Sequence, residues 1–131
     1  MSRRLAVLAG LMTVSMLGAG CAREVSYKQD VFPILSENCL SCHKVGGTGL
    51  AKSGLNMETY EGLMKGTKLG PIVTAGSSVS STLVLLIERQ AHPSINMPKD
   101  KPPIPADRIK IIRQWIDQGA KWGTHWAYIA P

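Results

Sequence analysis

Residues 38–47 read NCLSCHKVGG, and this stretch brings Cys39, Cys42 and His43 together within five positions. The whole chain has 131 residues but only three cysteines and three histidines. Such a concentration of scarce, reactive side chains calls for a chemical explanation. Whatever the motif binds must be enclosed by the rest of the chain, so the motif bears on the fold as well as on the chemistry.

The spacing Cys-x-x-Cys-His is compatible with three kinds of site. In covalent haem c attachment, two thiols join the two haem vinyl groups and the adjacent histidine reaches the iron. A thioredoxin-like redox pair expects a βαβ context, which this sequence lacks. A closed zinc site needs four ligands, and His92 and His125 stand alone. The motif therefore predicts one covalent haem c, held by Cys39 and Cys42, with His43 as an iron ligand.

The first twenty residues have the layout of a secretory signal peptide. Arg3 and Arg4 precede an uncharged run from Leu5 to Gly20, which is slightly short for a membrane-spanning helix and contains three glycines. Small residues before Cys21 resemble a bacterial lipobox, although Gly18 stands where leucine is usual. We expect a lipoprotein-type signal peptide at 1–20, a lipid anchor on Cys21, a linker at 21–25 and one domain at 26–131. Ordinary cleavage nearby is the alternative.

The charge of the chain says less about its partners than the motif says about its cofactor. Without Arg3 and Arg4 the formal net charge falls from +6 to +4. A mildly basic balance suits an acidic partner or a membrane surface, but it also serves plain solubility. The basic residues are spread along the chain without aromatic interleaving, so nucleic-acid binding has no support.

The remaining sequence predicts an all-α domain. Helical patterns cover residues 26–39, 57–66, 77–90 and 105–120, whereas no segment alternates as a strand. In the first pattern Pro33 fits if Asp30 caps the helix. In the last, Ile109, Ile112, Trp115 and Ile116 form the apolar face, Pro105 suits the first turn and Gly119 ends the helix. Long glycine- and proline-rich loops at 45–54 and 92–105 would need an apolar body such as a haem to hold them.

A second axial ligand could come from methionine or histidine. Met64 lies on a helical pattern where packing explains it, and Met57 follows His43 too closely to reach the other haem face easily. Met97 lies in a loop, and Pro98 biases it towards an extended backbone. We expect Met97 as the distal ligand, with His92 or an open site as alternatives.

These segments together resemble a class I type cytochrome c, and above all the planctomycete-type cytochrome c domain. The similarity rests on DVFPILSENCLSCH (30–43), SGLNMETYEGLMKG (53–66) followed by IVTAGSS (72–78), and RQWIDQGAKWGTHWAYIAP (113–131), and it covers nearly all of residues 25–131. It implies a compact helical fold around haem c, in which the helix of Phe32 packs against that of Trp115. It also implies attachment at Cys39 and Cys42, His43 as proximal ligand and Met97 as distal ligand. The sequence departs from the family pattern after Pro98, where Lys99 replaces a second proline.

The function implied is that of a small exported monohaem cytochrome, lipid-anchored on the periplasmic side of a bacterial membrane, that passes single electrons between redox proteins. One alternative is a haem enzyme or sensor with an open distal site for peroxide or a small gas. Another is a haem-containing docking subunit of a larger redox complex. Lys44, Lys99 and Lys101 adjoin the proposed ligands in sequence and could steer an acidic partner. Gly70-Pro71 is read as a plain turn rather than as the carbonyl that orients His43.

Overall fold

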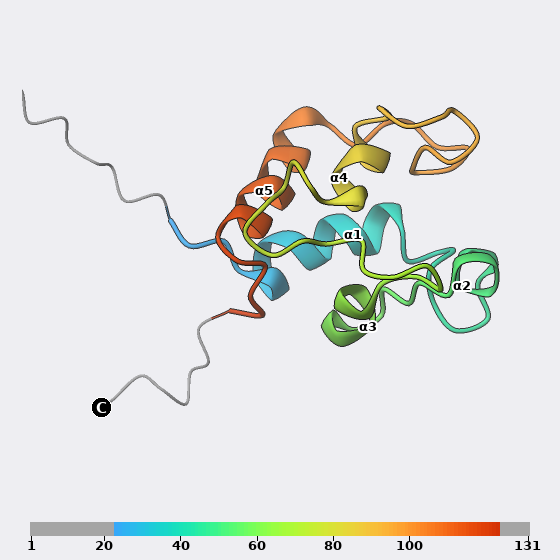
Figure 1. The fold of residues 1–131 in the computed structure, drawn as a ribbon, viewed down its shortest axis with the longest axis horizontal. Coiled ribbons are helices and arrows are strands. Elements are labelled where there is room, and N and C mark those ends of the chain that lie inside the picture. The colour runs from blue at the N-terminus through green and yellow to red at the C-terminus, as the bar shows by residue number, and fades with distance from the viewer. Residues whose placement is uncertain (1–22, 124–131) are drawn as a thin grey trace, which may run out of the picture.

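The structure, a computed structural model, describes residues 23–123, so the expected signal peptide and Cys21 lie outside the described residues. Within residues 23–123 the chain is helical and forms no strand, which confirms the predicted all-α class; Thr67 and Gly70 make an isolated bridge. The elements, in chain order, are a π-helical turn η1 (Tyr27–Val31), α1 (Phe32–Asn38), α2 (Thr48–Ser53), α3 (Tyr60–Lys65), α4 (Thr82–Ile87) and α5 (Ala106–Asp117) (Figure 1). None of the helices in this range is long and apolar enough to cross a membrane.

The first helical segment begins earlier than Asp30, so the predicted cap is wrong. The Ser26 hydroxyl accepts the Gln29 N–H at 3.3 Å and starts the helix. In a regular helix the ring of Pro33 would clash with the carbonyl four residues before it. Here the preceding turn is π-helical, and the Phe32 N–H bonds to the Tyr27 carbonyl, five residues back. The wider turn accommodates the proline, while the Asp30 carboxylate accepts the Ser26 N–H instead.

The other predicted helices are present, and one helix was missed. Helices α3, α4 and α5 lie inside the predicted patterns, with Pro105 just before α5 rather than in its first turn. Helix α2 lies in the glycine-rich stretch that the sequence indicated as loop. It buries no side chain completely, so it carries no hydrophobic periodicity to detect. Its C-terminal end is stabilised by Lys68, whose ammonium donates to the carbonyls of Ala51 and Lys52.

The core joins the two ends of the described chain. The predicted apolar face of α5 is buried, and the ring of Trp115 lies 5.4 Å from that of Tyr27 in η1. Tyr60 and Trp122 complete an aromatic cluster around Tyr27, at 5.2 and 5.4 Å. The first and last helical segments therefore pack together, as the resemblance implies. The loops gather at the other end of the molecule, where residues 39–47, α2 and the loop 88–105 lie (Figure 1).

Candidate functional site

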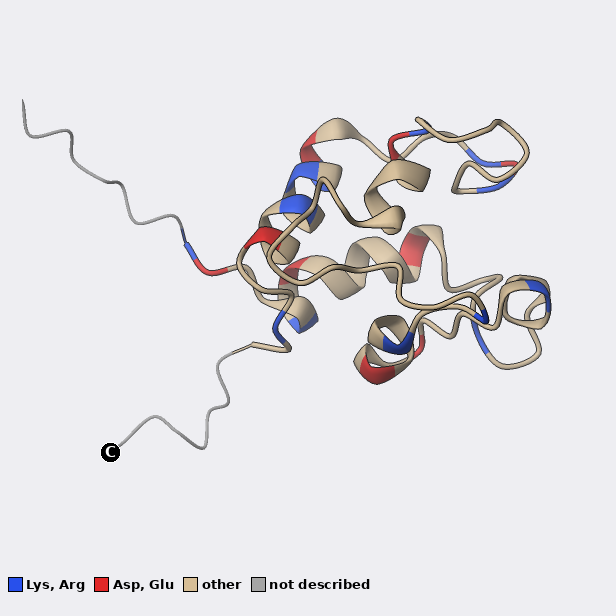
Figure 2. Cartoon of the chain, viewed as in Figure 1, with Lys and Arg blue, Asp and Glu red and all other residues tan. Residues whose placement is uncertain are grey.

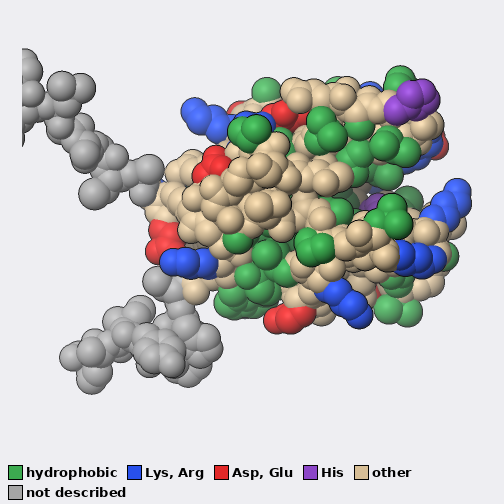
Figure 3. Space-filling view, viewed as in Figure 1, with side chains coloured by type: hydrophobic (Ala, Val, Ile, Leu, Met, Phe, Trp, Pro, Cys, Tyr) green, Lys and Arg blue, Asp and Glu red, His purple; other side chains and the backbone are tan. Residues whose placement is uncertain are grey.

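A cavity of about 380 Å³ opens among these loops, and all four residues singled out from the sequence line it: Cys39, Cys42, His43 and Met97. Its volume is within the range of small-molecule and cofactor sites. Much of the wall is aliphatic, formed by Leu55, Ile72, Leu83, Leu86 and Ile87. The space-filling view shows a hollow between two parts of the molecule, with hydrophobic side chains along it (Figure 3). The fold thus brings together the motif and a methionine far away in sequence.

The two cysteines follow directly on α1. Cys39 ends the helix with its N–H on the Leu35 carbonyl at 2.8 Å, and its own carbonyl accepts the N–H groups of Cys42 and His43. This tight turn points several side chains of the motif towards one cavity. Both thiols are free; Cys39 is buried and Cys42 is exposed. Burial raises the pKa of Cys39 to about 11.

His43 is buried, and its ring is fixed from one side. Its Nδ1 lies 3.4 Å from the carbonyl oxygen of Leu55, which can only accept, so the bond places the proton on Nδ1. Nε2 is then left unprotonated, as a metal ligand requires. Burial lowers the pKa of His43, while the bond to Leu55 opposes that effect, so the ring favours the neutral form. Nothing in the sequence marked Leu55 for this role, because a backbone carbonyl has no residue signature.

Backbone contacts around the motif explain the glycines that follow it. The Met57 N–H bonds to the His43 carbonyl at 2.8 Å, and the Leu50 N–H bonds to the Cys42 carbonyl at 3.0 Å. Gly49 lies against the imidazole, since a Cβ there would come 2.9 Å from His43 Cε1. Helix α2 therefore forms part of the site, and the GG-x-G run was the available signal for it. Gly70 is a plain turn, as expected, because its carbonyl accepts the Thr67 N–H.

The candidates for a second ligand differ in their position relative to the cavity. Met97 is half-buried in the cavity wall, with its N–H on the Leu86 carbonyl at 3.0 Å. Met57 also lines the cavity, but its backbone is bonded to that of His43, so it comes from the same side of the site. Met64 packs against the core outside the cavity lining. His92 is exposed, is bonded to Ser94 and is not part of the lining.

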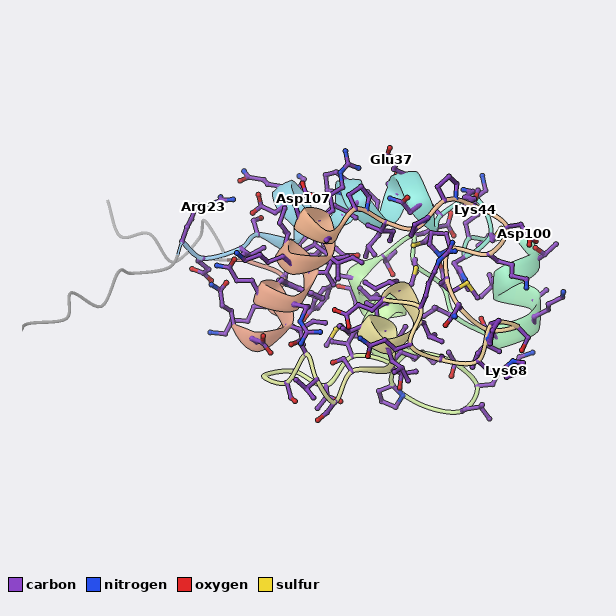
Figure 4. The ribbon with its side chains drawn as sticks, turned by 90° about the horizontal axis from the view of Figure 1, so that it is seen from above. Arg23, Glu37, Lys44, Lys68, Asp100 and Asp107 are labelled. Carbon is purple, nitrogen blue, oxygen red and sulfur yellow. The ribbon has the colours of Figure 1, made fainter. Side chains whose placement is uncertain are left out.

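Three lysines and one aspartate, Asp100, lie around the opening. Lys99 and Lys101 line the cavity, as does Lys52, which the sequence analysis did not single out; Lys44 is exposed but does not line it. The Lys101 ammonium donates to the Ser41 hydroxyl at 3.1 Å, which links the loop 88–105 to the motif. Lys and Arg segments lie at this end of the ribbon, with an acidic segment among them, and others lie on α5 (Figure 2). In Figure 4 the labelled Lys44, Lys68 and Asp100 lie at this end, and Arg23 lies at the opposite one.

The residues present fit a haem. Two thiols, an imidazole with an available Nε2, a thioether and an aliphatic wall meet at one cavity, which is the donor set that haem c needs. Among residues 23–123, no three His, Cys, Asp or Glu side chains come together as a metal-ion site. A closed zinc site is therefore not supported in this part of the chain.

Comparison with known proteins supports the same interpretation. Residues 39–101 match the family model of planctomycete cytochrome C. No curated protein and no solved structure was found to match the chain. The match is narrower than the range over which the sequence resembles the family, but it runs from the first cysteine of the motif through Met97. Domains of this kind carry covalently bound haem c and serve electron transfer. Over residues 39–101, the chain is therefore similar to the planctomycete cytochrome C family.

Proposed function

We propose that this protein is an exported monohaem c-type cytochrome that carries single electrons between redox proteins. The observation that supports this most is the cavity that joins Cys39, Cys42 and His43 to Met97. When bound there, haem supplies an iron that changes between the ferric and ferrous states. The protein supplies attachment, axial ligation and an apolar surrounding.

Each residue has a distinct task. The thiols of Cys39 and Cys42 would hold the haem through thioether bonds to its two vinyl groups. His43 offers Nε2 as the proximal ligand, and the Leu55 carbonyl fixes the ring orientation and makes the imidazole a better donor. Met97 would hold the iron through its sulfur, and a methionine ligand would raise the reduction potential relative to a second histidine. If His43 and Met97 both hold the iron, they would leave it no place for a substrate, and this arrangement would suit an electron carrier.

The location and partners belong to the same proposal. A signal peptide at 1–20 directs export, and a lipid on Cys21 holds the protein at the membrane. Lys52, Lys99 and Lys101 around the opening favour an acidic partner, because opposite charges speed encounter.

Attachment is tested by acid–acetone extraction of the protein from a host that makes c-type cytochromes. The haem of the wild-type protein should stay with the precipitated protein, and the Cys39→Ser/Cys42→Ser double variant should release its haem into the acidified acetone. One haem per chain is expected from the iron content. Haem from the wild-type protein that appears in the acetone supernatant would contradict the proposal.

Ligation is tested by comparing Met97→Ala with Met57→Ala, since both methionines line the cavity. Met97→Ala should abolish the absorption band that ferric haem shows with a sulfur ligand, lower the potential and allow fast cyanide binding. Met57→Ala should change only stability, by about 2–5 kcal/mol for a buried methionine. If Met57→Ala or His92→Ala removes the band instead, the assignment of Met97 is wrong.

The charge proposal is tested with the Lys52→Glu/Lys99→Glu/Lys101→Glu variant. Its reaction with an acidic acceptor should be slower than that of the wild-type protein, whose rate should fall with rising salt because charges beyond about 8 Å are screened at physiological ionic strength. A wild-type rate that is insensitive to salt would exclude steering by these lysines.

A further inference from the structure

The segment that carries Met97 is held to the end of α4 by a set of hydrogen bonds that converge on one residue, Arg89. The residue directly follows the cap of α4 and adopts φ 57°, the left-handed conformation that favours glycine. Its N–H bonds to the Leu86 carbonyl at 3.2 Å, and the same carbonyl accepts the Met97 N–H at 3.0 Å. The helix end and the proposed ligand thus share one acceptor.

The side chain of Arg89 extends these contacts to the residues after Met97. Its guanidinium Nη2 donates to the Lys101 carbonyl at 2.5 Å and lies 3.5 Å from the Pro98 carbonyl. The backbone carbonyl of Arg89 accepts from the Asn96 amide at 3.3 Å. Both neighbours of Met97 in the chain, Asn96 and Pro98, are therefore tied to Arg89, one through its backbone and one through its side chain.

A non-glycine residue in the left-handed conformation costs free energy unless its surroundings favour it. Glycine would end α4 with less strain, but it has no guanidinium to bond the loop. We propose that Arg89 is a positioning residue, which holds the segment 96–101 so that the Met97 sulfur stays directed into the cavity. This inference rests on the proposed function, because it assigns to Arg89 the retention of the ligand assigned there.

The test uses the haem-loaded full-length protein and four variants: Arg89→Gly, Arg89→Lys, Arg113→Gln and Met97→Ala. Arg89→Gly relaxes the backbone and removes the guanidinium, so it separates the two roles of the residue. Arg113→Gln is the matched control, because Arg113 pairs with Glu88 at 2.8 Å and, among the described residues, makes no hydrogen bond to the segment 96–101. The readouts are the rate of cyanide binding to ferric haem, the sulfur-ligand absorption band, and trypsin cleavage between Lys99 and Asp100.

We expect Arg89→Gly to bind cyanide about three- to tenfold faster than the wild-type protein, the factor that one or two lost hydrogen bonds give to an opening equilibrium. Cleavage after Lys99 should accelerate by a similar factor. Arg89→Lys has one compact ammonium in place of the forked guanidinium, so its rates of cyanide binding and cleavage should lie between those of the wild-type protein and Arg89→Gly. Arg113→Gln should behave as wild type.

The outcomes distinguish the inference from the proposed function. If Met97→Ala opens the site but Arg89→Gly matches Arg113→Gln in both cyanide binding and cleavage, Arg89 only closes the helix and the inference is wrong. If Met97→Ala itself leaves the band and the cyanide rate unchanged, Met97 is not the ligand, and the proposed ligation fails together with the role of Arg89.

Discussion

Replacing Gly49 by alanine is expected to disturb His43 directly. An added Cβ would lie 2.9 Å from His43 Cε1, 3.0 Å from Nδ1 and 2.9 Å from the Cys42 carbonyl oxygen, whereas ordinary contacts begin at 3.4 Å. The backbone oxygen cannot move easily, so the imidazole ring has to retreat by about half an ångström. The bond from Nδ1 to the Leu55 carbonyl, already 3.4 Å long, depends on the present tilt of that ring.

Two opposing effects set the size of the change. Overpacking of a closely packed site costs about 1–3 kcal/mol, while alanine in place of glycine within a helix gains up to about 1 kcal/mol. We therefore expect Gly49→Ala to lower the free energy of unfolding by about 1–2 kcal/mol, measured by urea titration. In the haem-loaded protein the tilted ring should also shift the reduction potential and the absorption spectrum.

The control is Ala51→Ser, which adds one heavy atom at an exposed position of the same helix. It should change stability by less than about 0.7 kcal/mol, the range of ordinary helix propensities, and leave the spectrum as it is. If Gly49→Ala is as stable as the wild-type protein and has the same spectrum and potential, the close contact between α2 and His43 does not constrain the ring.

Two further predictions concern the core. Tyr27 is buried, its hydroxyl has no partner among the described residues, and burial raises its pKa to about 12. Because the unfolded phenol ionises first, near pH 10, the free energy of unfolding should fall by about 2–3 kcal/mol as the pH rises from 10 to 12. Tyr27→Phe should remove this fall in alkaline urea titrations and be no less stable at pH 7. An unchanged fall would rule out Tyr27 as its source. The Asp117 carboxylate accepts hydrogen bonds from the Ser78 N–H at 2.7 Å and from the Ser78 hydroxyl at 2.9 Å. In thermal or urea unfolding, Asp117→Asn should therefore lower the free energy of unfolding by about 1–3 kcal/mol, and the control Asp107→Asn, at an exposed position of the same helix, by less than about 1 kcal/mol. Equal losses would contradict a special role for the Ser78 contact.

Sequence predicted those parts of the molecule whose residue types repeat or cluster. The period of Ile109, Ile112, Trp115 and Ile116 predicted α5 and its buried face, and this was confirmed. The spacing of Cys39, Cys42 and His43 predicted a site, and the cavity lies against all three, although their roles stay a prediction.

What the sequence did not predict depends on backbone groups and on short elements. Helix α2 has no buried side chain, so no apolar pattern marks it. The Leu55 carbonyl that orients His43 and the π-helical turn that accommodates Pro33 are properties of the folded backbone, which residue types do not encode locally. The helix start at Ser26 instead of Asp30 reflects competition between two good capping residues four positions apart.

The contacts between Arg23 and α5 have a consequence for the order in which the molecule forms. The amides of Gln114 and Gln118 donate to the Arg23 carbonyl across 91 and 95 positions of the chain, and the Val25 N–H returns a bond to Gln118. The motif, in contrast, bonds mainly to residues between 35 and 57. Local contacts form early and distant ones late, because closing a long loop costs more chain entropy. We therefore expect the thiols to be presented on a locally organised segment before the last helix arrives, which leaves a period during biogenesis when the cavity is still open to its cofactor. The packing of α5 against η1 would end that period. The contacts that stabilise the mature molecule would therefore also limit the time in which the cofactor can enter.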